Sequence, residues 1–218
     1  MNEVHHAQLD TLPPVEMRRP GRPVGSDSAQ TRARILEVAR HLIATRGYPA
    51  TTFAALASHS GFSRTTLHYY FDSLESIYQT LMADASAVAM RCITMASMEL
   101  TLAEQLAAYV TEFGRSSVSD RATVALLVSS RLTSAQAPAP AYDPADEIRA
   151  FVTQAIIDAI TRGELATDTE VLPLVDLFYS VLWGVGFYAG STDDTERVEM
   201  ITRQLSSVFK FGLLKSTY

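Results

Sequence analysis

The apolar residues of this sequence recur with the period of an α-helix, and residues that start or stop helices bound the apolar runs. Ile35, Ala39 and Leu42 share one helical face, and Gly47 follows them as a stop signal. We find no sustained alternation of period two and no Asn-Gly or Asp-Gly pair that would mark a hairpin. The sequence therefore predicts an all-α fold of about nine helices without a sheet.

Capping residues predict where these helices begin. Thr52 should open a short helix that stops at Gly61, and Ser63 should cap a second short helix over residues 64–70. Two short helices separated by a turn that contains glycine form a helix-turn-helix. The other predicted caps are Asp27, Asp72, Thr101, Ser119, Asp143, Thr167 and Asp193.

Basic residues gather near the start of a chain whose formal net charge is −6. Residues 18–71 contain eight arginines and only two acids, Asp27 and Glu37. A basic block on an acidic remainder is typical of a polyanion-binding module joined to another unit. We predict a flexible basic arm over 1–26, a helix-turn-helix domain over 27–72 that binds a polyanion such as DNA, and a helical domain over 73–218 that could be a sensor, a dimerisation unit or both.

The predicted helix over 64–70 should turn one face to solvent, because Leu67 is spaced to close the small core. The exposed face lacks the Lys and Glu of an ordinary solvated surface. Threonine methyls suit thymine, tyrosine phenols suit phosphate or sugar, and helix starts offer free N–H groups to phosphate. The predicted DNA-binding residues here are Thr51, Thr52, Ser63, Arg64, Thr65, Thr66, His68, Tyr69 and Tyr70.

Residues 31–77 resemble the TetR (tetracycline-repressor) family of transcriptional regulators. The matching motifs are R-x-x-I-L-x-x-A-x-x-L-I-x-x-x-G-Y (Arg32 to Tyr48) and T-T-F-x-x-L-A-x-x-S-G-F-S-R-x-T-L-x-Y-Y-F (Thr51 to Phe71). The resemblance implies a homodimer formed by the last two helices, double-stranded DNA as a partner, and release of DNA by a small-molecule effector. Family members often have Tyr at the position of His68, His at that of Tyr70, and Lys at that of Leu74. A phosphate contact from the fourth helix is therefore not expected, although Arg64 or the arm could replace it.

The arm contains the sequence RRPGRP, which alternates arginine with proline and glycine. Arg18, Arg19 and Arg22 could enter the narrow minor groove of A·T-rich DNA, where arginine is favoured. A plain basic tail is an equally good interpretation, because short basic clusters are common. Both interpretations stay open from the sequence.

Aromatic residues in the second unit suggest an effector pocket. In the resembling family, the helices that carry them surround a central cavity, and such a lining favours an apolar or aromatic effector. Ordinary core packing is the alternative for each residue. The candidate ligand-binding residues are Met95, Tyr109, Phe113, Phe151, Phe178, Tyr179 and Trp183.

The apolar segment 171–190 could be mistaken for a membrane span. It contains Pro173 and Asp176, and we interpret it as a buried helix covered by several neighbours. Gly184 and Gly186 remove side chains where other helices could approach closely. The first residues carry acids and no apolar centre, which is not the pattern of a signal peptide. We expect no membrane partner and a cytoplasmic protein, which the single Cys92 also suits.

Catalytic and metal motifs are missing from the sequence. There is no H-E-x-x-H, Walker A, G-x-S-x-G or Cys/His metal spacing. We interpret Glu147 and Asp158 as solvated surface acids. The sequence thus predicts no enzyme, no cofactor and no metal site.

The combined reading is a ligand-responsive transcriptional regulator, expected to repress, that binds a palindromic operator as a homodimer and is released by a small, mostly apolar effector. The alternative is an all-helical interaction or carrier protein whose basic front binds an acidic partner other than specific DNA.

Overall fold

The computed structural model describes residues 26–133, 138 and 143–212, and its regular structure is entirely α-helical there. The prediction of an all-α fold with about nine helices is confirmed for these residues. The predicted arm and most of the predicted 134–144 loop lie outside them. The helices are α1 (Ser26–Arg46), α2 (Phe53–Ser60), α3 (Arg64–Tyr70), α4 (Leu74–Ala96), α5 (Leu102–Gly114), α6 (Val118–Thr133), α7 (Pro144–Thr161), α8 (Val171–Gly190) and α9 (Thr195–Phe211).

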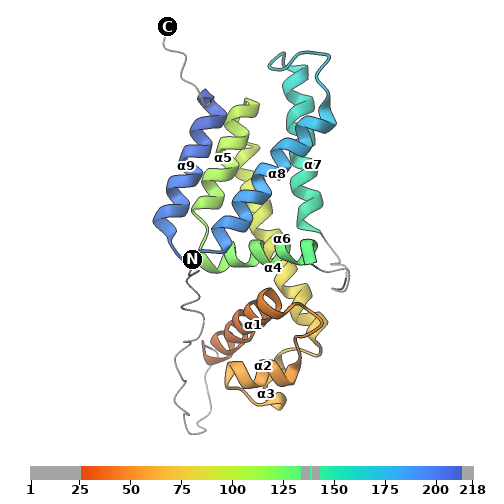
Figure 1. Ribbon diagram of the computed structural model, residues 1–218, viewed down its shortest axis with the longest axis vertical. Coiled ribbons are helices and arrows are strands. Elements are labelled where there is room, and N and C mark those ends of the chain that lie inside the picture. Colours follow the sequence, from red (N-terminus) through yellow and green to blue (C-terminus); the bar gives the residue numbers. More distant parts are fainter. Residues whose placement is uncertain (1–25, 134–137, 139–142, 213–218) are drawn as a thin grey trace, which may run out of the picture.

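Helices α1, α2 and α3 gather at one end of the molecule, and α4 leads from them into the remaining helices (Figure 1). We call these two parts the head (α1–α3) and the body (α5–α9). Leu56 of α2 and Leu67 of α3 are completely buried with Ile35 of α1. A second apolar cluster fills the body and includes the last turns of α4, where Cys92 is buried and its pKa is raised to about 12 by that burial. The domain boundary near residue 72 stays a prediction.

The short head helices begin and end where the sequence predicts. The Thr52 hydroxyl accepts a hydrogen bond from the Ala55 N–H at 3.1 Å, and the Ser63 hydroxyl accepts one from the Thr66 N–H at 3.0 Å. Gly61 ends α2 with a φ of 75°, a left-handed conformation that favours glycine. The capping box that begins at Thr101 and the Asp143-Pro144 start of α7 are also confirmed.

Other helix starts are displaced from the predicted caps. Helix α4 is capped by Ser73 rather than Asp72, because the Ser73 and Ser76 hydroxyls each accept a hydrogen bond from the other residue's N–H. Asp194, not Asp193, accepts from the Arg197 N–H at the start of α9. The predicted starts at Asp27, Ser119 and Thr167 are also wrong, since α1 begins at Ser26, α6 at Val118 and α8 at Val171.

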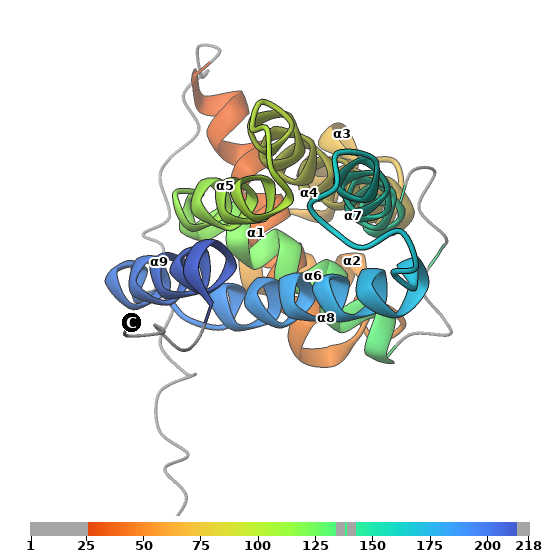
Figure 2. The same ribbon diagram turned by 90° about the horizontal axis from the view of Figure 1, so that it is seen from above.

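Helix α8 packs on one side only. Figure 2 shows α4, α5 and α7 gathered on one side of it. By length and composition it is the one helix of the described residues that could cross a membrane, and 17% of its apolar window is buried. Within the single chain the predicted burial of this helix is therefore only partial, and its cover by further neighbours stays a prediction.

The buried side of α8 lies unusually close to α6. A Cβ at Gly190 would overlap the Ala125 Cβ and the Arg121 carbonyl oxygen, and one at Gly186 would lie 3.2 Å from Val124 Cγ1. Gly186 thus allows the close approach expected from the sequence, whereas Gly184 faces open space. Glycine at position 190 allows the two helix backbones to meet.

Replacing Gly190 with alanine should destabilise the protein. The new methyl overlaps backbone as well as side-chain atoms, and overpacking costs about 1–3 kcal/mol of unfolding free energy. Chemical denaturation at equal protein concentration measures the change. Ser180→Ala, at an exposed position of the same helix, is the matched control and should leave the unfolding free energy within about 0.5 kcal/mol of the parent. Equal stability of the two variants would contradict the close contact.

Candidate DNA-binding face and core pocket

Helix α3 is held by its own cap and by one buried side chain. Leu67 points into the head core and is completely buried. At the start of the helix the Ser63 and Thr66 hydroxyls lie 2.8 Å apart, and Ser63 also accepts from the Thr66 N–H. The opposite side of α3 is therefore free to face solvent.

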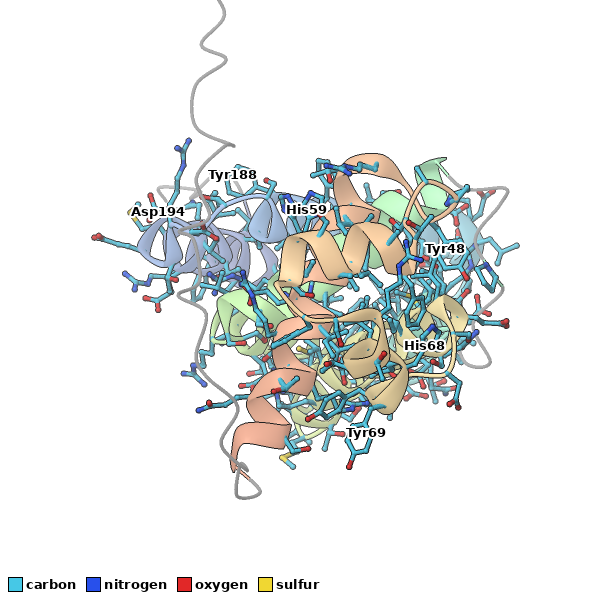
Figure 3. All side chains as sticks on the ribbon, turned by 90° about the horizontal axis from the view of Figure 1, so that it is seen from below. Tyr48, His59, His68, Tyr69, Tyr188 and Asp194 are labelled. Atoms are coloured by element: carbon cyan, nitrogen blue, oxygen red, sulfur yellow. The ribbon has the colours of Figure 1, made fainter. Side chains whose placement is uncertain are left out.

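That exposed side carries the most exposed aromatic ring of the head. Tyr69 is 81% exposed and points away from the ribbon when the molecule is seen from the head end (Figure 3). Its ring meets the edge of Tyr70 at 5.1 Å between centroids. Arg64 and Thr65 are exposed beside it. These side chains form a face on α3 that a DNA groove could contact.

His68 joins the same face and is fixed by α2. Its ring stacks on Phe53 with 4.4 Å between centroids and 9° between planes. Figure 3 shows His59 on the same end of the molecule. His59 Nε2 lies 3.1 Å from an Arg46 Nη2, and its Nδ1 lies 2.8 Å from the Ala55 carbonyl oxygen. Arg46 and His59 thus add basic groups that were not among the predicted site residues, although Arg46 belongs to the arginine-rich block.

Several predicted DNA-binding residues have structural partners instead. Thr51 is 3% exposed, and its hydroxyl donates to the Gly47 carbonyl oxygen at 3.0 Å. Its side chain is thus turned into the head in this conformation, and the assignment of Thr51 to DNA binding stays a prediction. The hydroxyls of Thr52 and Ser63 are occupied as helix caps, and Thr66 is half-buried. Arg18, Arg19 and Arg22 lie outside the described residues.

The electrostatics of the head favour an anionic partner. No acidic residue occurs between Glu37 and Asp72 in the sequence, so the face carries arginine and histidine without nearby carboxylates of its own chain segment. Leu74 is half-buried at the start of α4 and offers no charge to phosphate. Phosphate contacts are therefore left to the α3 face, to Arg46 and His59, and to the helix starts.

In the body, three of the predicted ligand-binding residues meet at one small pocket. Tyr109, Phe113 and Trp183 line it together with aliphatic residues, and its free volume is about 20 Å³. A space of that size holds a water molecule or two and no apolar effector. The pocket must therefore widen before a ligand of useful size can enter. The aliphatic lining residues are Val110, Val124, Val128, Ile148, Leu182 and Val185.

The remaining candidates lie around or away from this pocket. Phe151 stacks on Tyr109 at 5.9 Å, and Tyr179 lies 5.3 Å from Trp183. Phe178 meets Phe209 of α9 at 5.9 Å. Met95 is exposed and lines a separate surface depression, so the structure does not bring it to the pocket.

The core near this pocket is less apolar than the sequence indicates. Burial raises the pKa of Tyr109 well above its usual value, so its phenol stays neutral. Glu147 is not a solvated acid as interpreted from the sequence. One of its oxygens accepts a hydrogen bond from Ser86 at 3.1 Å, and the other is buried without a partner. Among the described residues, no cluster of three His, Cys, Asp or Glu side chains could hold a metal.

Comparison with known proteins finds a family match for the head. Residues 35–81 match the family model described as "Bacterial regulatory proteins, tetR family". The family match thus covers most of the head and the first part of α4. The chain is 23% identical over 161 residues to the HTH-type transcriptional regulator UidR of Escherichia coli K12, which covers 72% of this chain and 82% of UidR. The match to TetR proteins thus includes much of the body.

Solved TetR-like structures share this fold. A γ-butyrolactone receptor (ArpA-like protein) has a TM-score of 0.62 at 21% identity, over 88% of this chain and 92% of its own. FadR from Bacillus subtilis, solved with stearoyl-CoA, has a TM-score of 0.58 at 14% identity, over 84% and 99%. The head thus matches the TetR family model, the curated relative is an HTH-type transcriptional regulator, and the α3 face is the candidate DNA-binding surface of this chain.

Tyr69→Ala should weaken sequence-specific DNA binding without unfolding the protein. The ring is mostly exposed, so its loss removes a DNA contact worth about 1–3 kcal/mol, roughly tenfold or more in affinity, and little packing. Fluorescence anisotropy with an operator obtained by selection from random duplexes measures DNA affinity. Thermal unfolding measures stability. Met98→Ala is the control, because Met98 is also an exposed large side chain but lies just beyond the far end of α4. Unchanged affinity in Tyr69→Ala would remove Tyr69 from the DNA-binding face.

Proposed function

We propose that this TetR-family protein is a repressor that binds a palindromic operator as a homodimer and leaves it when a small, mostly apolar effector occupies the body. The single observation that carries the proposal is the exposed face of α3, where Arg64, Thr65, His68 and Tyr69 stand together without an acid. In this proposal Arg18, Arg19 and Arg22 of the arm add contacts to DNA. A cytoplasmic location follows from access to DNA.

The uncovered apolar side of α8 supports the dimer. Leu172, Leu177 and Phe187 of α8 are exposed, as are Met200 and Phe211 of α9. Exposed apolar groups of this number on two adjacent helices favour association with a matching surface. In the proposal, α8 and α9 of two copies pack together and hold two α3 helices about 34–36 Å apart, one turn of duplex DNA.

The core pocket supports an apolar effector. Its lining is aromatic and aliphatic, with the neutral phenol of Tyr109. Structures with the same fold include a γ-butyrolactone receptor and a FadR bound to stearoyl-CoA, so the fold accommodates ligands with apolar parts. An effector acts only through its preference for one conformation. In this proposal it prefers a widened pocket in which the two DNA-binding heads are wrongly spaced. Residues 27–72 then form the DNA-binding unit and 73–218 the effector and dimer unit.

Selection of bound duplexes from a random pool tests the DNA part of the proposal. We expect a palindrome with half-sites one helical turn apart, bound at least about 10³-fold more tightly than bulk DNA at physiological salt. The binding constant should fall linearly with salt on a double-logarithmic plot. Recovery of no common sequence would contradict a specific operator. Binding to acidic proteins that matches binding to DNA would favour the interaction-protein alternative.

Leu177→Glu should convert the dimer into monomers. The side chain is 57% exposed in the single chain, so the change leaves the monomer folded while placing a carboxylate in the proposed interface. Sedimentation velocity measures the mass, and the same variant should lose operator binding. Leu100→Glu is the matched control at a 79% exposed leucine outside α8 and α9 and should stay dimeric. A dimeric Leu177→Glu protein would exclude this part of α8 from the interface.

A further inference from the structure

Glu147 of α7 has one carboxylate oxygen that no described residue satisfies. Its Oε2 accepts a hydrogen bond from the Ser86 hydroxyl of α4 at 3.1 Å, whereas its Oε1 is buried without a hydrogen-bond partner. Arg149, the basic residue nearest to it in the sequence, is already paired with Asp176 at 2.7 Å. A buried carboxylate oxygen without a donor is energetically costly, so a donor that reaches it binds favourably.

This carboxylate lies beside the core pocket. Ile148, the next residue of α7, lines the pocket. Tyr109 of α5 lines it as well, and the charge of Glu147 adds to the rise that burial causes in the pKa of Tyr109. Glu147 therefore supplies negative charge to a site whose lining is otherwise aromatic and aliphatic.

The aromatic part of the lining suits an organic cation. Tyr109, Phe113 and Trp183 all line the pocket, and the face of an aromatic ring attracts ammonium groups. The Arg149 guanidinium already lies 5.5 Å from the centroid of the Tyr179 ring, which is itself 5.3 Å from that of Trp183. A molecule with an apolar skeleton and one ammonium group thus finds a partner for each of its parts.

We propose that the effector of the core pocket is an apolar amine, whose ammonium group donates to Glu147 Oε1 while its apolar part lies against the aromatic lining. The proposal rests on the proposed function, because it names the chemical class of the effector. The pocket still has to widen from its free volume of about 20 Å³. Ser86 belongs to α4, so a ligand at Glu147 touches the helix that joins the body to the head (Figure 1).

Three probes of similar shape and different charge test the proposal. Phenethylamine, phenethyl alcohol and phenylacetate share a phenyl ring and carry a positive, a neutral and a negative group at neutral pH. Isothermal titration calorimetry with the full-length protein, without DNA, measures the three dissociation constants. We expect the amine to bind about tenfold more tightly than the alcohol, because its hydrogen bond to the carboxylate is charge-assisted on both sides. Phenylacetate should bind most weakly.

Variants of Glu147 assign this preference to its carboxylate. Glu147→Gln keeps the shape of the side chain and removes its charge, so it should bind the amine and the alcohol about equally. Asp146→Asn is the matched control, because Asp146 is an exposed acid in the same turn of α7, and it should keep the tenfold preference. Glu147→Asp, which withdraws the carboxylate by one methylene, should reduce the preference to a few-fold and is the second variant if Glu147→Gln does not fold.

Equal affinity of the parent protein for the amine and the alcohol would overturn the proposal. Tightest binding of phenylacetate, no binding of any probe, or an undiminished preference in the Glu147 variants would also overturn it. No DNA enters these measurements, so they do not depend on the repressor assignment. An amine that binds through Glu147 and leaves operator affinity unchanged would contradict the proposed function instead.

Discussion

The contact between α6 and α8 at Gly190 determines how the molecule can transmit a change. At this point the two backbones meet without an intervening side chain, so α6 cannot shift along α8 without breaking close packing. Helix α6 also contributes Val124 and Val128 to the core pocket. Because α5 and α7 also line the pocket, a ligand that widens it must displace at least one of the four helices α5, α6, α7 and α8.

The same helix α6 touches the head. Leu126 is buried in the head cluster, and the Ser119 hydroxyl accepts from Arg40 of α1. The pocket, the α8 contact and the head thus share one rigid element rather than a series of loops. A small displacement of α6 has a direct route to the orientation of α1, and through the buried core of Ile35, Leu56 and Leu67 to α3. This continuity offers one physical route by which the proposed effector could act on the head.

Local chemistry explains which features the sequence predicted. The caps at Thr52 and Ser63 and the Gly61 turn depend on neighbouring residues only, so the head helices were predicted almost to the residue. At the start of α4, Asp72 and Ser73 are both good caps, and the reciprocal Ser73–Ser76 pair decides between them only in three dimensions. The environment of Glu147 was misread because its burial depends on Ser86, 61 positions away.

The exposure of α8 could not be read from its composition. An apolar helix predicts burial but does not say whether the cover comes from the same chain. Here Asp176 forms an ion pair with Arg149 at 2.7 Å, while Leu172 and Leu177 stay exposed nearby on the same helix. The ion pair ties α8 to α7 and leaves the leucines for another surface. The composition of α8 alone would suit a membrane span equally well. The pattern of exposed positions therefore says more about which side of α8 is left for a partner surface.

The division of polar groups within α3 limits how the head can read DNA. The Ser63 and Thr66 hydroxyls are hydrogen-bonded at the start of the helix. Their side chains therefore have little freedom to contact bases. The exposed side chains of α3 that remain for the proposed base contacts are Arg64, Thr65, His68 and Tyr69. The His68 ring is already held flat against Phe53, so it loses little conformational entropy when it binds. Tyr69 is 81% exposed, and its ring contacts that of Tyr70 at 5.1 Å between centroids. The head therefore holds the His68 ring more firmly than the Tyr69 ring.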